Sequence, residues 1–442
     1  MSLLKQMLLS KSKIVMNIVL ALFWVWCTFG FISEEIAPFL LSLESGIFFL
    51  VDVVLMVTGV LVLKNKWDKI FIGSFLALSF WVTCIYNGYS IIFYLNGLRE
   101  FIYLLWLVPL LRFIYNSDYG DEFVKRFDKH LFVFLIVQAI CITFQFVKYG
   151  ANDHGGGSMG NGFSGIVSIL IYLISFYLMK KKMNPESYWK TILNNKWLII
   201  LLYPTLLNET KISFILLALY FVLLLPLTKK TTMKLVFLFP VICVLMYFVF
   251  NVYMTTTDSQ FDITSQDFLE AYFYAEEDDD IVEWVSVLQE RGEDFVADGT
   301  LDIPRFTKYV MIPELNEYYP GHTITGYGLG HFKGGTMIEN SKFYIENEWL
   351  LRGSIPYGYH AYIQFGFFSI FYFIWLWFRF ISLKLDVKAN KEIIIYIILI
   401  TLIIMLYNEF FRCGILCIAF FYIFTQALRW NSEENKTIET TK

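Results

Sequence analysis

Long apolar stretches are the feature that most constrains how this 442-residue chain can fold. Lipid offers no hydrogen-bond partners, so only helices and closed barrels can cross a bilayer. These stretches are too long and too continuously apolar for barrel strands, which alternate in polarity. We therefore predict an all-α polytopic membrane protein with about twelve transmembrane helices. The twelve predicted spans are residues 14–32, 39–63, 70–86, 91–115, 131–149, 162–179, 197–208, 212–228, 235–252, 359–380, 393–407 and 414–428.

Composition excludes the main soluble classes. Hydrophobic residues make up 57% of the chain and charged residues only 17%, whereas soluble domains carry about a quarter charged residues. The net charge of −4 provides no basic field that would attract nucleic acid. The expected surroundings are a lipid bilayer, and no nucleic-acid partner is expected.

The seventh and eighth predicted spans are short. We interpret them as a pair joined by a tight turn at residues 208–211, with a re-entrant hairpin as the competing interpretation.

Lys and Arg predict the orientation of the chain, because basic residues concentrate in cytoplasmic loops. With the N-terminus inside, the alternating inside segments hold 25 of the 35 basic residues and the outside segments hold nine. The split predicts that both termini face the cytoplasm. It also places the long segment 253–358 outside.

The predicted organisation has four parts: helices 1–9 over residues 1–252, a large outer loop over 253–358, helices 10–12 over 359–428 and a cytoplasmic tail over 429–442. The loop holds twenty acidic and six basic residues and no Cys. Its acidic run at 276–280 is interpreted as a solvated tip, with a divalent-cation site as the alternative. Loop helices are predicted over 281–290 and 340–352.

Arg99 is the strongest single candidate for a functional residue. It lies in the middle of a predicted span, where an Arg costs on the order of 2.5–3.5 kcal/mol. Arg99 either contacts an anionic substrate or forms a buried pair with Asp52 or Glu44. Its neighbour Glu100 points to another side of the helix.

Further candidates lie near the predicted outer face. Lys211 lies at the outer end of the eighth span, where it either meets a headgroup phosphate or snorkels or pairs with Glu209. Arg412 lies in the turn between the last two spans, where it either joins a cation cluster or pairs with Glu409. The region before the tenth span contains Gly326-Tyr327-Gly328-Leu329-Gly330-His331-Phe332, then Glu346-Asn347-Glu348-Trp349-Leu350-Leu351-Arg352, then Tyr359-His360-Ala361-Tyr362-Ile363. The glycine motif lacks the strand–turn–helix context of a dinucleotide site, and the histidines lack zinc-ligand spacing. No metal or cofactor is expected.

The predicted location limits the chemistry. An enzyme at the outer face has no nucleotide pool, so its substrate must arrive activated in the lipid, as a polyprenyl-diphosphate-linked sugar does. Such a reaction needs cations for the diphosphate and a base for the acceptor hydroxyl.

The predicted arrangement resembles the O-antigen polymerase and ligase superfamily of bacterial inner-membrane glycosyltransferases. The shared features are the number of spans and one large outer loop in the C-terminal half of the chain. Gly326–Phe332 is similar to a Gly-x-Gly-x-Gly-x-Phe stretch of that loop. Residues 346–350 resemble a His-Asn-x-Tyr-Leu motif in which Glu346 replaces the His, and His360 offers a second placement of that motif. Residues 209–213 resemble a Ser-Arg segment with Lys211 in place of Arg, and the Arg99 stretch resembles a Leu-Arg element.

The resemblance implies an inner-membrane polymerase. It would transfer an undecaprenyl-diphosphate-linked glycan chain to the next lipid-linked repeat unit at the periplasmic face, with a chain-length regulator protein as a partner. Glu346 or His360 would be the base. The residues expected to bind diphosphate or glycan are Arg99, Lys211, Arg352, Arg412, Arg305 and His331. The alternatives are an O-antigen ligase and, in a different class, a polysaccharide transporter or flippase.

Overall fold

The structure is a computed structural model that describes residues 3–150, 155–183, 188–208, 212–225, 305–332, 341–351, 353, 355–383 and 389–430. Every regular element within these ranges is helical, in agreement with the predicted all-α class. Six helical stretches in these ranges are long and apolar enough to cross a membrane. They are Lys11–Ile36, Pro38–Val62, Lys66–Tyr86, Ile91–Tyr115, Gly120–Tyr149 and Ser164–Lys181.

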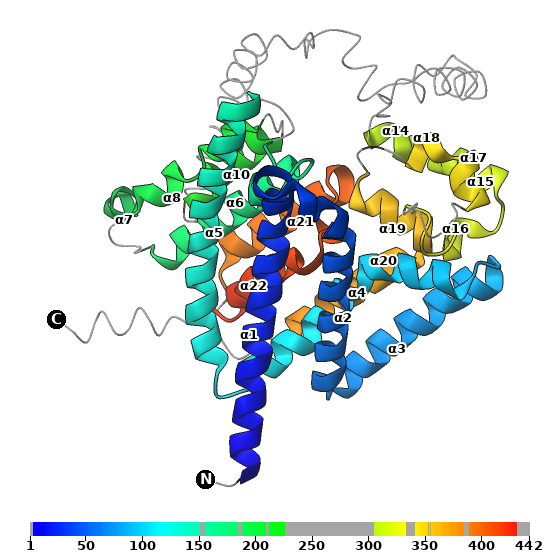
Figure 1. The fold of residues 1–442 in the computed structure, drawn as a ribbon, viewed down its shortest axis with the longest axis horizontal. Coiled ribbons are helices and arrows are strands. Elements are labelled where there is room, and N and C mark those ends of the chain that lie inside the picture. Colours follow the sequence, from blue (N-terminus) through cyan, green and yellow to red (C-terminus); the bar gives the residue numbers. More distant parts are fainter. Residues whose placement is uncertain are drawn as a thin grey trace.

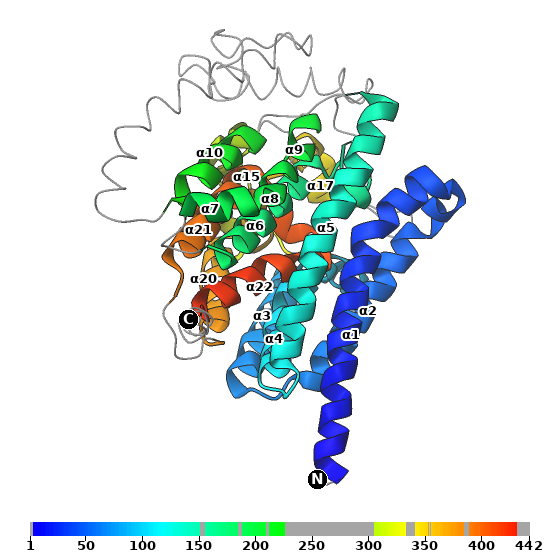
Figure 2. The ribbon, with the colours of Figure 1, turned by 90° about the vertical axis from the view of Figure 1, so that its left-hand side faces the viewer.

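The first five long helices run along the bundle in alternating directions (Figures 1 and 2). They are α1 (Leu3–Phe31), α2 (Glu44–Val62), α3 (Lys66–Phe80), α4 (Ile91–Tyr115) and α5 (Gly120–Tyr149). Polar side chains cap the N-termini of two of these helices. The Asn65 side chain accepts from the backbone N–H groups of Trp67 and Asp68 at the start of α3, and the Ser90 hydroxyl accepts from Phe93 N at the start of α4.

The centre of the bundle forms around α6 (Ser164–Lys181), nearly all of which is buried. The helices that pack against it include α5, α10 (Ile212–Leu224), α21 (Lys391–Tyr407) and α22 (Cys417–Leu428). A helix that is apolar on all sides must be surrounded by others. The sequence of α6 therefore fits its central place.

The short seventh span predicted at 197–208 forms two helices, α8 (Lys196–Ile200) and α9 (Pro204–Leu207). Asn208 follows them and is buried, where its side-chain amide donates to Ser164 O and to the Ser168 hydroxyl. Residues 209–211, and with them most of the predicted turn, lie outside the described residues, as does the predicted ninth span at 235–252.

The tenth predicted span is bent sharply instead of straight. Its residues form α19 (Tyr357–Phe365) and α20 (Phe368–Ile381), whose axes differ by 117°. Gly366 stands at the bend with φ +54°, and a Cβ there would lie 2.5 Å from Thr323 O. The bend therefore needs glycine at this position, because the backbone of residues 323–326 leaves no room for a side chain.

The described part of the predicted outer loop forms short helices over a small apolar core. They are α14 (Arg305–Val310), α15 (Ile312–Tyr318), α16 (His322–Thr325), α17 (Lys342–Glu346) and α18 (Glu348–Leu351). Met311, Leu315, Tyr327, Phe343 and Leu350 are among the core side chains. The helix predicted over 340–352 is thus present as α17 and α18, separated at Asn347. The acidic run and the helix predicted at 281–290 lie outside the described residues.

An ionic cluster joins α3, α4 and α20 at the bundle end where α3 begins. The buried Asp68 carboxylate accepts from Arg112 Nε at 2.8 Å, from Arg379 Nε at 3.0 Å and from Arg379 Nη2 at 2.6 Å. Arg112 also donates to the Ser382 hydroxyl at 2.8 Å. One carboxylate of α3 is therefore the counter-charge for α4 and for α20, which lies about 300 residues further along the chain.

We expect Asp68→Asn to destabilise the bundle by about 3–5 kcal/mol, because it leaves two partly buried guanidinium groups without a counter-ion. Thermal unfolding of the protein in detergent measures this effect. Glu122→Gln is the control, since Glu122 forms an exposed pair with Arg126 and its loss costs under about 1 kcal/mol. Equal melting temperatures for the two variants would contradict the role given to Asp68.

Candidate functional site

A cluster of polar side chains lies in the apolar bundle where α4, α19 and the turn after α21 meet. Its centre is Glu100 of α4, which is 3% exposed. Glu100 Oε2 lies 2.7 Å from His360 Nε2 and accepts from Gln364 Nε2 at 3.0 Å, while Glu100 Oε1 accepts from Arg412 Nη2 at 3.1 Å. An isolated carboxylate in such surroundings would be very unstable. The three partners make this position possible.

Helix geometry sets this arrangement. His360 and Gln364 are four residues apart on α19, so their side chains lie on the same face of that helix. Both are fully buried, and their side-chain nitrogens lie 2.6 Å apart beside Glu100 Oε2. Glu100 Oε2 is thus shared by two side chains from one face of α19.

Arg412 links the cluster to the neighbouring turn. This turn is the 3₁₀ helix η6 (Phe410–Arg412), which follows α21. Arg412 Nη1 donates to Glu409 Oε2 at 2.6 Å, and Nη2 donates to Glu100. Its buried Nε has no hydrogen-bond partner among the described residues. Two of the five N–H donors of this guanidinium are thus used by carboxylates, and the Nε–H is available to a ligand oxygen.

The glycine-rich segment 326–332 closes over this cluster. Its residues Gly326, Gly328 and Gly330 all have positive φ. Gly330 N donates to Gln364 Oε1 at 3.2 Å, which turns the Gln364 amide so that its NH₂ faces Glu100. A Cβ on Gly97 of α4 would lie 2.2 Å from Gly330 N. The segment approaches α4 this closely only because both positions are glycine.

Phe332 at the end of this segment covers the cluster. Its ring centroid lies 4.6 Å from that of His360, and the Arg412 guanidinium lies 5.8 Å from the ring centroid of Phe332. Phe101 stacks against His360 from α4 at 5.8 Å. Aromatic rings from two sides thus cover the His360 imidazole.

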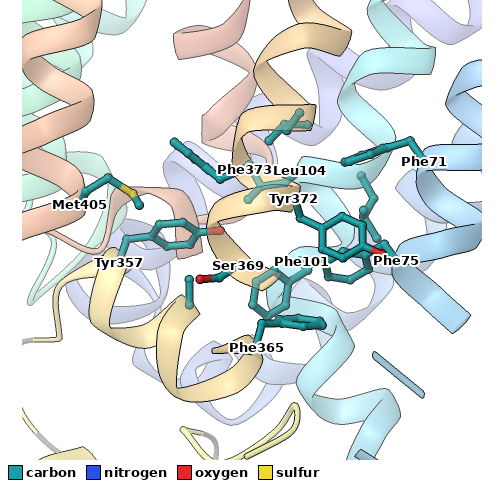
Figure 3. A pocket seen from close by; sticks show the side chains of 13 residues that line it. Phe71, Phe75, Phe101, Leu104, Tyr357, Phe365, Ser369, Tyr372, Phe373 and Met405 are labelled. Atoms are coloured by element: carbon teal, nitrogen blue, oxygen red, sulfur yellow. The ribbon is translucent and has the colours of Figure 1, made fainter. Parts of the chain in front are cut away.

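An apolar pocket of about 40 Å³ adjoins the cluster (Figure 3). Its lining residues Phe101, Tyr357, Ala361 and Phe365 are direct or close neighbours of the cluster residues on α4 and α19. The hydroxyl of Ser369 lies at the α19–α20 bend and donates to Gly366 O at 2.7 Å. The bend therefore has a polar cluster on one side and an apolar space on the other.

Arg99 faces away from this cluster. Arg99 Nε donates to Asp52 Oδ2 of α2 at 2.7 Å, and the Tyr103 hydroxyl also donates to Asp52. The guanidinium lies 5.3 Å from the ring centroid of Phe49. Arg99 thus forms the predicted pair with Asp52, in which Asp52 is buried and the Arg99 side chain is 25% exposed.

Two further predicted binding residues lie beside the cluster. The Arg305 guanidinium lies 3.9 Å from the ring centroid of Tyr407, at the end of α21 that leads into η6. His331 precedes Phe332 and is 1% exposed, with Nδ1 at 2.7 Å from the Ser341 hydroxyl and Nε2 at 2.7 Å from Tyr327 O. Lys211 and Arg352 lie outside the described residues.

Glu346, one of the two predicted bases, lies apart from the buried cluster. It is exposed and accepts from the Tyr319 hydroxyl at 2.7 Å, with Lys342 at 3.4 Å. The Tyr319 hydrogen bond, with a smaller contribution from Lys342, lowers the pKa of Glu346. A carboxylate with a lowered pKa is a weaker base.

Sequence reasoning missed Glu100 and Gln364 as members of the site. Glu100 is adjacent to Arg99, which the sequence favours more strongly as a functional residue. The available signal was a second ionisable residue in the same span, which is costly unless it is paired. Gln364 follows His360 by one helical turn, and this spacing indicated a shared face.

Among the described residues, no group of three or more His, Cys, Asp and Glu side chains is placed to hold a metal ion. No protein-family model, no curated protein and no solved structure matches this chain. The site must therefore be interpreted from its own chemistry.

The burial of His331 is expected to make the free energy of unfolding depend on pH. Burial lowers the pKa of His331 to about 4, against about 6.5 for the unfolded chain. The unfolded state then binds the extra proton, so stability is complete above pH 6.5 and falls as the pH drops from 6.5 towards 4, by up to about 3 kcal/mol. We expect the melting temperature of the wild type to fall more between pH 7.5 and 5.0 than that of His331→Gln. Parallel curves for the two proteins would contradict this expectation.

Proposed function

We propose that this protein is a polymerase of lipid-linked oligosaccharides that acts at the outer face of a bacterial inner membrane. The single observation that carries the proposal is the cluster of Glu100, His360 and Arg412. It combines a candidate base, the carboxylate that orients this base, and a guanidinium suited to diphosphate. These are the groups that transfer of a glycan from a polyprenyl diphosphate requires.

His360 is the better of the two candidate bases. Its contact with Glu100 at 2.7 Å has the form of a base held by a carboxylate. In the proposed step, the acceptor hydroxyl gives its proton to His360 while its oxygen bonds to the anomeric carbon of the donor. The bond from that carbon to the phosphate oxygen breaks, and the diphosphate leaves with the electron pair.

Arg412 supplies the proposed diphosphate contact. It is already paired with Glu100 and Glu409, so the incoming phosphate would add to this network through Nε, the guanidinium donor without a partner among the described residues. Charge that develops on the leaving oxygen would be stabilised in an enclosure with little water, where such contacts are strongest.

Entry of the substrate requires Phe332 to move. The ring contacts His360 and covers Arg412 in this structure. The glycine segment that carries Phe332 is attached to α19 and α4 by backbone contacts. In this proposal the acceptor sugar would replace the Phe332 ring against His360.

We expect His360→Ala and Arg412→Ala each to reduce polymer synthesis at least about 100-fold, the usual contribution of a positioned base or an oxyanion-stabilising donor. The measurement is gel analysis of lipopolysaccharide in a host whose own copy is deleted, with membrane levels of each variant checked by immunoblot. A polymerase defect leaves core with one repeat unit, whereas a ligase defect leaves bare core.

Lys342→Gln is the matched control, because Lys342 is exposed in the same predicted loop. Complete ladders in both the His360 and Arg412 variants, at normal membrane levels, would refute the proposed site.

One observation favours a transporter as the second candidate. The buried ionisable cluster adjoins a span that breaks by 117° between α19 and α20, and transporters commonly bind substrate at broken helices. Purified protein in vesicles with polyprenyl-diphosphate oligosaccharide as the probe separates the two functions. We expect longer lipid-linked products. Unchanged chain length, with the oligosaccharide exposed to an external glycosidase, would instead identify a flippase.

A further inference from the structure

A cavity of about 530 Å³ lies at the opposite end of α4 from the candidate site. Its volume is within the range of small-molecule sites. It occupies the region where α2 ends, α3 begins and α4 leads into α5, at the lower end of the bundle in Figure 1. The lining residues are Ser12, Val62, Lys64, Asn65, Asp68, Pro109, Arg112, Phe113, Asn116, Ser117 and Asp118.

The charged groups of this cavity favour an anion. Asp68 is shared by Arg112 and Arg379, so this trio carries a net charge of +1. Lys64 adds a second positive charge, with its Nζ 5.6 Å from the ring centroid of Phe113. Asp118 is the opposing group and lies exposed, where solvent screens it.

The Arg112 side chain is held rigidly at the cavity wall. Asp68 and Ser382 accept from Nε and Nη2, and the side chain remains 17% exposed. A preorganised guanidinium binds a phosphate oxygen with less loss of conformational freedom than a free one.

The position of the cavity favours a lipid as the source of the anion. It lies at the ends of helices that are long and apolar enough to cross a membrane. Leu61 and Trp67, which flank the lining segment 62–65 in the sequence, are 76% and 59% exposed. These apolar side chains offer a surface for acyl chains beside a basic pocket, as in pockets that bind acidic headgroups.

We propose that this cavity binds the phosphodiester headgroup of an anionic phospholipid, with Arg112 and Lys64 as the contacts to phosphate. This site is independent of the function proposed above, because it lies at the other end of α4. The basic residues of the sequence predict that this end faces the cytoplasm. The bound lipid would be one of the inner leaflet.

The test is native mass spectrometry of the full chain after extraction from nanodiscs that contain phosphatidylglycerol in a phosphatidylcholine background. We expect the wild type to retain phosphatidylglycerol in preference to phosphatidylcholine. Lys64→Gln should weaken this retention roughly five-fold, which corresponds to about 1 kcal/mol for one basic residue near the headgroup.

Lys66→Gln is the matched control, because Lys66 is exposed, lies two residues away and does not line the cavity. Equal losses in both variants would indicate surface charge alone and would overturn the proposal, as would retention of both lipids in equal amounts. Inorganic phosphate, added at millimolar concentration as a competitor, distinguishes a site for free phosphate from a site for a phospholipid. If inorganic phosphate displaces phosphatidylglycerol, the cavity recognises the phosphate group alone. If phosphatidylglycerol stays bound, the cavity recognises the whole lipid.

Discussion

The buried Glu100 carboxylate is the interaction on which the candidate site depends. A charge in an apolar bundle is tolerated only when partners surround it, and Glu100 has His360, Gln364 and Arg412 within 3.1 Å. These partners come from α19 and from the turn after α21. One carboxylate thus joins α4 to two parts of the chain about 260 and 310 residues further on.

An ionic cluster also holds α4 nearer its C-terminal end. Arg112 of α4 and Arg379 of α20 share Asp68 of α3. Between these two ionic clusters lie aromatic and aliphatic side chains and the small pocket of Figure 3. Ionic contacts at both ends fix the position of α4 against the bent pair α19–α20. This arrangement places His360 Nε2 2.7 Å from Glu100 Oε2.

Close backbone packing completes the site. Gly97 admits the backbone of Gly330, and Gly366 admits the segment before the glycine motif. The motif therefore acts through its shape, since it brings Phe332 onto His360 and orients Gln364. Its glycines are required by contacts with other helices, and no bound phosphate needs to be invoked to explain them.

The sequence by itself determined the helical class and the membrane-spanning character of the long apolar segments. Uninterrupted apolar runs permit no other structure in lipid, and this constraint is local. The sequence also singled out His360, through the motif-like segment 359–363, and Arg412, through its place in the turn between the last two predicted spans. The bend at Gly366 and the break at Asn347 were not visible in the pattern, since both depend on contacts with distant segments.

Only the tertiary structure decided which charges meet. Arg99 and Glu100 are adjacent in the chain, yet the first pairs with Asp52 and the second with His360, because consecutive helical residues point about 100° apart and face different neighbours. The partner of a buried charge is chosen by helix packing across hundreds of residues. Spacing along one helix shows which side chains share a face, and it contains no information about what that face will meet.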